Sequence, residues 1–201
     1  MTDPTGPPDL GRGPGRRGAP LGPYAIERIL GGVSASPSER PELREALLDL
    51  WIAVTDTGGS VGFAAPADRG AIGTALDREL DDVASGRDDL LVLFGHDEAI
   101  GLVFLRSRGN PLFDHWRTVM RLMVHPDHQG RGHARSLLGD AELVAAWRGC
   151  EHLQLTVRGG EGLEAFYERH GYREVGRHPG AVRMPDGTDR DEIMFVRSLG
   201  R

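Results

Sequence analysis

The chain contains no lysine, and all 24 of its basic residues are arginines. Asparagine is present once, at Asn110, whereas glycine occurs 29 times and proline 13 times. Lysine and asparagine have A-rich codons, while glycine, proline and arginine have GC-rich ones. This bias indicates a GC-rich genome, and we expect a bacterial source. The absence of lysine also excludes a Walker A phosphate loop, which needs Gly-Lys followed by Ser or Thr.

Cysteine and long apolar runs are scarce as well. Cys150 is the only cysteine, which excludes an intramolecular disulfide and a cysteine-based zinc site and fits a reducing, cytoplasmic location. The longest apolar run, Leu90–Phe94, is far shorter than the roughly 18 residues that span a membrane. The N-terminus lacks the apolar centre of a signal peptide. The net charge of −6 weighs against nucleic acid as a partner. We therefore expect neither a membrane nor a nucleic acid as partner.

Residues 1–22 differ in composition from the rest of the 201-residue chain. They hold six glycines and five prolines, with Arg12, Arg16 and Arg17 among them. Such a segment cannot bury enough apolar surface to offset its ordering entropy. It is expected to be a disordered leader, with a nucleic-acid-binding arm as the alternative. Residues 23–201 are of the size of one domain.

Hydrophobic periodicity predicts about seven strands and four helices in the order βααβββαβαββ. This order is typical of an α/β (α+β) fold with a mixed sheet and helices on its faces. A capping box at Ser36–Glu39, with Pro37 at the first helical position, introduces the first helix. The predicted strands are 24–29, 90–94, 99–105, 116–124, 152–157, 172–176 and 193–197. The later helices are 68–86, 134–147 and 161–170.

The segment Arg121–Leu138 is the most informative part of the chain. A buried strand leads into a turn with Gly130 and Gly132, and the turn opens a helix. Glycines let the backbone approach a ligand closely, and a helix N-terminus adds partial positive charge, so this arrangement predicts a diphosphate cradle without lysine. It is not a dinucleotide loop, because Arg135 stands where the third glycine belongs.

Two motifs resemble the GCN5-related N-acetyltransferase (GNAT) family. Gln129-Gly130-Arg131-Gly132-His133-Ala134 is similar to its Gln/Arg-x-x-Gly-x-Gly/Ala signature. Ala165–Tyr172 resembles its Phe-Tyr-x-x-x-Gly-Phe/Tyr segment and lies at the expected separation. The resemblance implies the GNAT fold over roughly residues 23–199. In that fold a mostly antiparallel sheet is splayed between its fourth and fifth strands, here 116–124 and 152–157.

The resemblance also implies acetyl-CoA as acetyl donor. Backbone N–H groups of the turn are expected to hold the pyrophosphate, and the edge of the preceding strand is expected to pair with the pantetheine. The implied cofactor-binding residues are Leu122, Met123, Val124, Gln129, Gly130, Arg131, Gly132, His133, Ala134 and Arg135. The family often has an asparagine six residues before its Phe-Tyr pair, where this chain has Gly160. That contact is therefore lost or taken over by backbone.

Tyr167 matches the tyrosine that protonates the departing thiolate in the family. A phenol with a pKa of about 10 is protonated at neutral pH, and the conjugate acid of a thiolate has a pKa of about 8.5. A modest depression of the tyrosine pKa would match the two groups. The alternative is a packing role for Tyr167, since Leu163, Phe166 and His170 share its helix.

The general base is less clear from the sequence, because strand 116–124 carries no carboxylate. His115 is the catalytic candidate by position, with Asp114, His178, Glu192 and a water chain as alternatives. His125, Asp127, His128 and His133 are irregularly spaced in the phosphate turn. We therefore expect no metal site there.

The acceptor is expected to lie between residues 51–63 and 178–192. Asp186, Asp189, Asp191 and Glu192 would attract a cationic amine, unless they form only a solvated face. The predicted function is direct acetyl transfer in a ternary complex from acetyl-CoA to a small-molecule amine. A non-catalytic acyl-CoA sensor and a protein acetyltransferase are the alternatives. The sequence leaves a monomer and a homodimer both open.

Overall fold

The computed structural model describes residues 24–32 and 40–200, so the 1–22 leader and the Ser36–Glu39 capping box lie outside the described residues. The strands are β1 (Tyr24–Leu30), β2 (Asp89–Gly95), β3 (Glu98–Arg106), β4 (Trp116–Val124), β5 (His152–Arg158), β6 (Arg173–Arg183) and β7 (Asp189–Ser198). The helices are α1 (Pro41–Asp56), α2 (Arg69–Ala84), α3 (His133–Trp147) and α4 (Leu163–Arg169), with short 3-10 turns η2 (Pro111–Phe113) and η3 (Pro126–His128).

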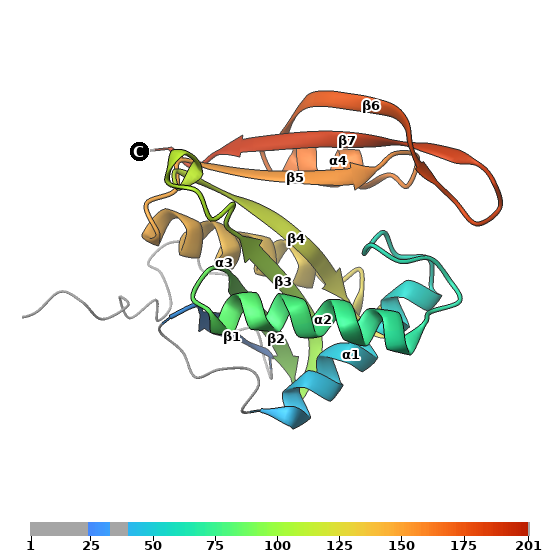
Figure 1. Ribbon diagram of the computed structural model, residues 1–201, viewed down its shortest axis with the longest axis horizontal. Coiled ribbons are helices and arrows are strands. Elements are labelled where there is room, and N and C mark those ends of the chain that lie inside the picture. Colours follow the sequence, from blue (N-terminus) through green and yellow to red (C-terminus); the bar gives the residue numbers. More distant parts are fainter. Residues whose placement is uncertain (1–23, 33–39, 201) are drawn as a thin grey trace, which may run out of the picture.

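The strands form one seven-stranded sheet in the order β1-β2-β3-β4-β5-β7-β6. All neighbours are antiparallel except β4 and β5, which are parallel. These two strands pair only from Trp116–Thr118 to His152–Gln154 and then diverge (Figure 1). The predicted fold class, including the splay between the fourth and fifth strands, is confirmed.

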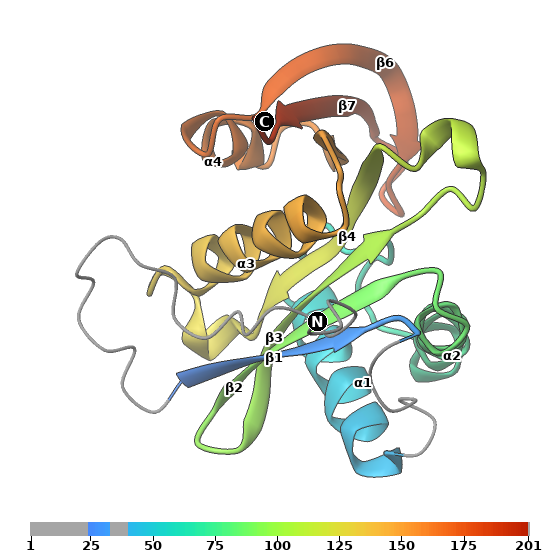
Figure 2. The same ribbon diagram turned by 90° about the vertical axis from the view of Figure 1, so that its left-hand side faces the viewer.

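Helices cover both faces of the sheet (Figure 2). Helices α1 and α2 lie on one face, and α3 and α4 lie on the other. The central strands carry long apolar runs, Leu90–Phe94 in β2 and Ala99–Leu105 in β3, because their alternate side chains enter two different cores. Leu91 and Val103 pack on the α3 side, whereas Val92 and Phe104 pack on the α1–α2 side. This two-sided burial explains why these strands lack the alternation of a half-exposed strand.

The start of the first helix differs from the predicted start. Helix α1 begins at Pro41, whereas the sequence predicted a start at Pro37. Pro41 fits the first turn because the N–H that proline lacks has no acceptor there. Helix α2 begins as predicted, since Asp68 accepts a hydrogen bond from the Ala71 N–H at 3.0 Å. In the described part of the chain, no helix is long and apolar enough to cross a membrane.

The last hairpin is much longer than the sequence indicated. Strands β6 and β7 extend through most of residues 178–192, which lie between the predicted strands 172–176 and 193–197. Nearly every residue of β6 is exposed, so no hydrophobic alternation marks the strand. Ion pairs between the two strands contribute instead, with Arg177 Nη1 3.1 Å from Asp191 Oδ2 and Arg183 Nε 2.7 Å from Asp189 Oδ1. Cross-strand charge pairs of this kind contribute to sheet stability where the side chains are exposed.

Candidate active site

A cavity of about 700 Å³ lies where β4 and β5 diverge. Its walls come from the end of β4, the turn after it, the start of α3, the outer half of β5 and helix α4. The predicted site residues all line this cavity except Arg131 and His115. The structure thus brings Leu122–Val124, the glycine turn and Tyr167 together at one slot.

The turn between β4 and α3 has the geometry of an anion cradle. Gly130 and Gly132 have φ of +73° and +84°, a left-handed conformation that L side chains rarely adopt. A Cβ at either position would meet no heavy atom of the described residues within 4 Å, so neither glycine is packed against them. Gly132 provides no side-chain cap to α3. The first N–H groups of α3 therefore lack a side-chain acceptor from the cap residue and can bind an anion.

Side chains of the turn hold its shape and add positive charge. The Gln129 amide donates to the Val124 carbonyl oxygen at 3.0 Å, which ties the turn to the end of β4. Arg131 and Arg135 are exposed and have no ion-pair partner in the described ranges. The His133 ring packs against Tyr24 at 4.5 Å between centroids, and burial lowers its pKa. The His133 ring thus belongs to the packing, while its backbone N–H is the first of α3.

Tyr167 is both a packed residue and a lining residue of the cavity. Its side chain is 8% exposed, and its ring contacts Phe166, Tyr172 and Phe195 at centroid distances of 5.1, 5.7 and 6.2 Å. Burial raises the pKa of Tyr167 to about 12, so the phenol does not have the depressed pKa that would match a thiolate. It remains a protonated hydrogen-bond donor at any pH near neutrality.

Arg121 occupies a bulge in β4 that the sequence did not reveal. Its φ is +56°, and the pairing between β3 and β4 shifts register across this point. A bulge of this kind redirects a side chain and ends regular pairing. The Arg121 guanidinium lies over the Trp51 ring at 4.9 Å and donates to the Val61 carbonyl oxygen at 3.1 Å. It thereby fixes the loop between α1 and α2 against β4.

A buried carboxylate balances this arginine. Glu79 of α2 is 4% exposed and lies with its Oε1 3.7 Å from Arg121 Nη2. Glu79 also pairs with Arg106 at the end of β3. Burial lowers the pKa of Arg121, and Glu79 acts in the opposite direction. A buried glutamate on an otherwise apolar helix face has no distinctive sequence signal, so this network was missed.

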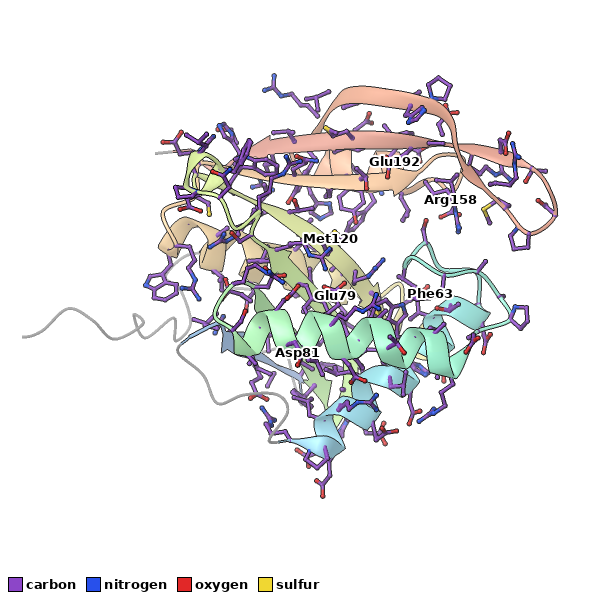
Figure 3. The ribbon with its side chains drawn as sticks, in the orientation of Figure 1. Phe63, Glu79, Asp81, Met120, Arg158 and Glu192 are labelled. Carbon is purple, nitrogen blue, oxygen red and sulfur yellow. The ribbon has the colours of Figure 1, made fainter. Side chains whose placement is uncertain are left out.

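A second cavity of about 490 Å³ adjoins the first. The two cavities share lining residues from the α1–α2 loop, β4 and β5, among them Val61, Arg121 and Thr156. The second is bounded by Phe63 and Met120 on one side and by Arg158 and Glu192 on the other (Figure 3). The structure therefore brings both predicted acceptor segments, 51–63 and 178–192, to one place. Trp51 itself is fully buried and packs behind Phe63 at 5.8 Å.

The structure does not bring His115 to the cavities. His115 precedes β4, at the end where β4 and β5 still pair, and its carbonyl oxygen accepts from the Glu151 N–H at 2.7 Å. It lies about 20 Å along the strand from Leu122 at the usual rise per residue. Asp114 is at the same end, and neither lines the cavities described above. Among the described residues, no group of three or more His, Cys, Asp or Glu side chains is arranged to hold a metal.

Comparison with known proteins finds similarity to acetyltransferases, both in a domain model and in solved structures. Residues 86–174 match the model of the acetyltransferase (GNAT) domain. A GNAT-family acetyltransferase from Streptococcus pneumoniae superposes with a TM-score of 0.68 at 16% identity, covering 87% of this chain and 99% of that one. The ribosomal-protein-S18-alanine N-acetyltransferase from Escherichia coli gives 0.62 at 17% identity, with 89% and 95% covered.

A third structure carries a ligand. The yncA protein from Salmonella typhimurium, determined with its cofactor acetyl-CoA, superposes with a TM-score of 0.68 at 15% identity, covering 89% of this chain and 95% of that one. The domain match includes β4, the glycine turn and Tyr167, which form the cavity described above. Residues 86–174 thus match a GNAT acetyltransferase domain, and the chain shares the fold of these acetyltransferase structures.

Proposed function

We propose that this protein transfers the acetyl group of acetyl-CoA to an amine of a small-molecule acceptor, by direct attack while both substrates are bound. One observation carries the proposal. Tyr167 and the glycine cradle line the same cavity, and that cavity lies in the slot between β4 and β5. A proton donor, an anion site and an unpaired strand edge are thus within one ligand-sized space.

The residues of the slot fit acetyl-CoA, which supplies an acetyl group activated as a thioester. The open space at Gly130 and Gly132 and the uncapped start of α3 suit the pyrophosphate. Arg131 and Arg135 are free to pair with phosphate oxygens. Beyond Thr118, β4 has no partner strand on its β5 side among the described residues, so Leu122–Val124 offer backbone groups to the pantetheine amides.

In this proposal the amine nitrogen attacks the acetyl carbonyl carbon, a new C–N bond forms, and the C–S bond breaks with its electron pair leaving on sulfur. Tyr167 donates its hydroxyl proton toward that sulfur. Full transfer is uphill, since the Tyr167 pKa of about 12 exceeds the pKa of about 8.5 of a thiol. The proton that the amine releases therefore restores the phenol. Water in the open cavity relays it, because β4 carries no carboxylate, His115 lies at its other end, and the Glu161 carboxylate in the cavity is paired with Arg158.

A small acceptor is supported by the shape of the second cavity, which the α1–α2 loop and the β6–β7 hairpin bound on two sides. The test is incubation of the purified protein with acetyl-CoA and a panel of small amines, with a peptide carrying a free N-terminus included. Acetylated amine should appear by mass spectrometry together with released thiol. Tight acetyl-CoA binding without any transfer would identify a sensor. Transfer to the peptide alone would identify a protein acetyltransferase, the activity in the name of the Escherichia coli structure.

A further inference from the structure

The second cavity contains an unbalanced charge. Among the described residues, four charged ones line it, namely Arg121, Arg158, Arg183 and Glu192. Two of the arginines have carboxylate partners outside the cavity lining, Arg121 with Glu79 at 3.7 Å and Arg183 with Asp189 at 2.7 Å. Arg158 pairs with Glu161, which lines the first cavity.

Glu192 is the exception. It has no hydrogen-bond or ion-pair partner within the described ranges. In the strand register it lies opposite Arg158, yet the Arg158 side chain turns to Glu161 and to the Gly58 carbonyl oxygen at 3.4 Å. The neighbouring acidic residues already have partners. Asp189 and Asp191 pair with arginines, and Asp186 accepts a hydrogen bond from Thr188. The uncompensated charge of the cavity is therefore one carboxylate.

The positions of Glu192 and Tyr167 indicate which end of a bound acceptor would contact this carboxylate. Tyr167 lines only the first of the two cavities, Glu192 lines only the second, and the shared residues lie between them. Apolar side chains, including Phe63, Met120 and Met184, line the second cavity beside Glu192. A bound acceptor would thus place its reacting amine near the shared residues and its far end near the carboxylate.

We propose that Glu192 binds a positive charge carried by the acceptor at the end away from the amine that is acetylated. The acceptor class is then a flexible amine with a distal cationic group, joined by a short apolar spacer. A charge pair in an open pocket gives about a fivefold preference. This inference rests on the proposed acetyl transfer for the identity of the acceptor site, but its binding test is independent of turnover.

The test uses three amines of equal length that differ only at the distal end: 1,5-diaminopentane, pentylamine and 5-aminopentanoate. Their binding to the full-length protein with coenzyme A is measured by calorimetry. The diamine should bind about fivefold more tightly than pentylamine, and the aminopentanoate should bind most weakly. In Glu192→Gln the ratio of diamine to pentylamine affinity should fall to about one. Asp186→Asn, a carboxylate of the same hairpin outside the cavity lining, should keep the wild-type ratio.

Equal binding of diamine and pentylamine by the wild type, or no binding of either, would overturn the inference. So would a preference that survives in Glu192→Gln or disappears in Asp186→Asn. Thiol release from acetyl-CoA is followed in parallel. A distal-charge preference without transfer to any amine refutes the proposed function and leaves the role of Glu192 standing. Transfer that is indifferent to the distal group refutes only the role of Glu192.

Discussion

Trp51 and Arg121 donate hydrogen bonds to the same acceptor, the carbonyl oxygen of Val61, each at 3.1 Å. The indole reaches it from α1 and the guanidinium from the bulge in β4. This shared acceptor fixes the α1–α2 loop, which lines both cavities. The shape of the proposed acceptor site therefore depends on a contact between a core residue and a strand irregularity.

Gly62→Ala tests this contact. A Cβ on Gly62 would lie 2.0 Å from Arg121 Nη1, so the guanidinium must move away from Val61 and Glu79. We expect a loss of about 2 kcal/mol in the free energy of unfolding, measured by urea denaturation. Gly58→Ala is the matched control, because Gly58 also has a positive φ of +85° but nothing within 4 Å. Equal losses in the two variants would show that Arg121 does not hold the loop.

Tyr167→Phe should lower kcat by about 100-fold, at the low end for general acids, because the raised pKa makes this phenol a weak acid. The affinity for acetyl-CoA should be retained, since the ring packing is unchanged. Steady-state kinetics and calorimetry measure the two quantities. Tyr172→Phe is the control, since Tyr172 is 1% exposed and does not line the cavity. Unchanged kcat in Tyr167→Phe would remove Tyr167 from the mechanism.

Tyr172→Phe should itself change stability in the favourable direction. The Tyr172 hydroxyl is buried and has no hydrogen-bond partner among the described residues. Removing an unsatisfied buried hydroxyl relieves a desolvation cost, which predicts a gain of about 1 kcal/mol in the free energy of unfolding. Urea denaturation at neutral pH measures it. A loss of 1 kcal/mol or more, on the order of one hydrogen bond, would show that the hydroxyl is satisfied.

Gly132→Ala should weaken acetyl-CoA binding by about tenfold, because the left-handed φ of +84° at the start of α3 is strained for alanine and the cradle would shift. Gly139→Ala provides the contrast. Gly139 lies inside α3, has an ordinary φ and nothing within 4 Å of its Cβ. Gly139→Ala should raise the free energy of unfolding by about 0.5–1 kcal/mol and leave acetyl-CoA binding intact. Calorimetry that finds the same affinity for both variants would argue against the cradle.

The free energy of unfolding should fall as the pH becomes alkaline. Burial raises the pKa of Tyr167 to about 12 and also raises that of Tyr172, whereas an unfolded tyrosine has a pKa of about 10. Their stabilising contribution is complete below about pH 10, and it is lost as the pH rises toward the folded pKa, because the unfolded state then releases protons first. Urea denaturation between about pH 9 and 11 should show a steep decline, shallower in Tyr167→Phe. A flat profile would contradict this explanation.

The sequence was most informative where structure is local. The glycine turn before α3 and the start of α2 at Asp68 depend on neighbouring residues, and the apolar runs at 90–94 and 99–105 predicted the strands β2 and β3. Longer-range features were not visible. An arginine enters a left-handed bulge only because Trp51, Val61 and Glu79 receive its side chain. The β6–β7 hairpin was underestimated because backbone pairing and ion pairs, not apolar alternation, extend it.

The divergence of β4 and β5 also bears on aggregation. An unpaired strand edge is a template on which strands of other chains can assemble. Here the free edge of β4 faces β5 across a slot, inside the sheet rather than at its rim. The rim strand β6 is instead protected by charged side chains, including Arg173, Glu174 and Arg177. The unpaired edge of β4 is thus less accessible to other copies of the chain than the edge of a rim strand.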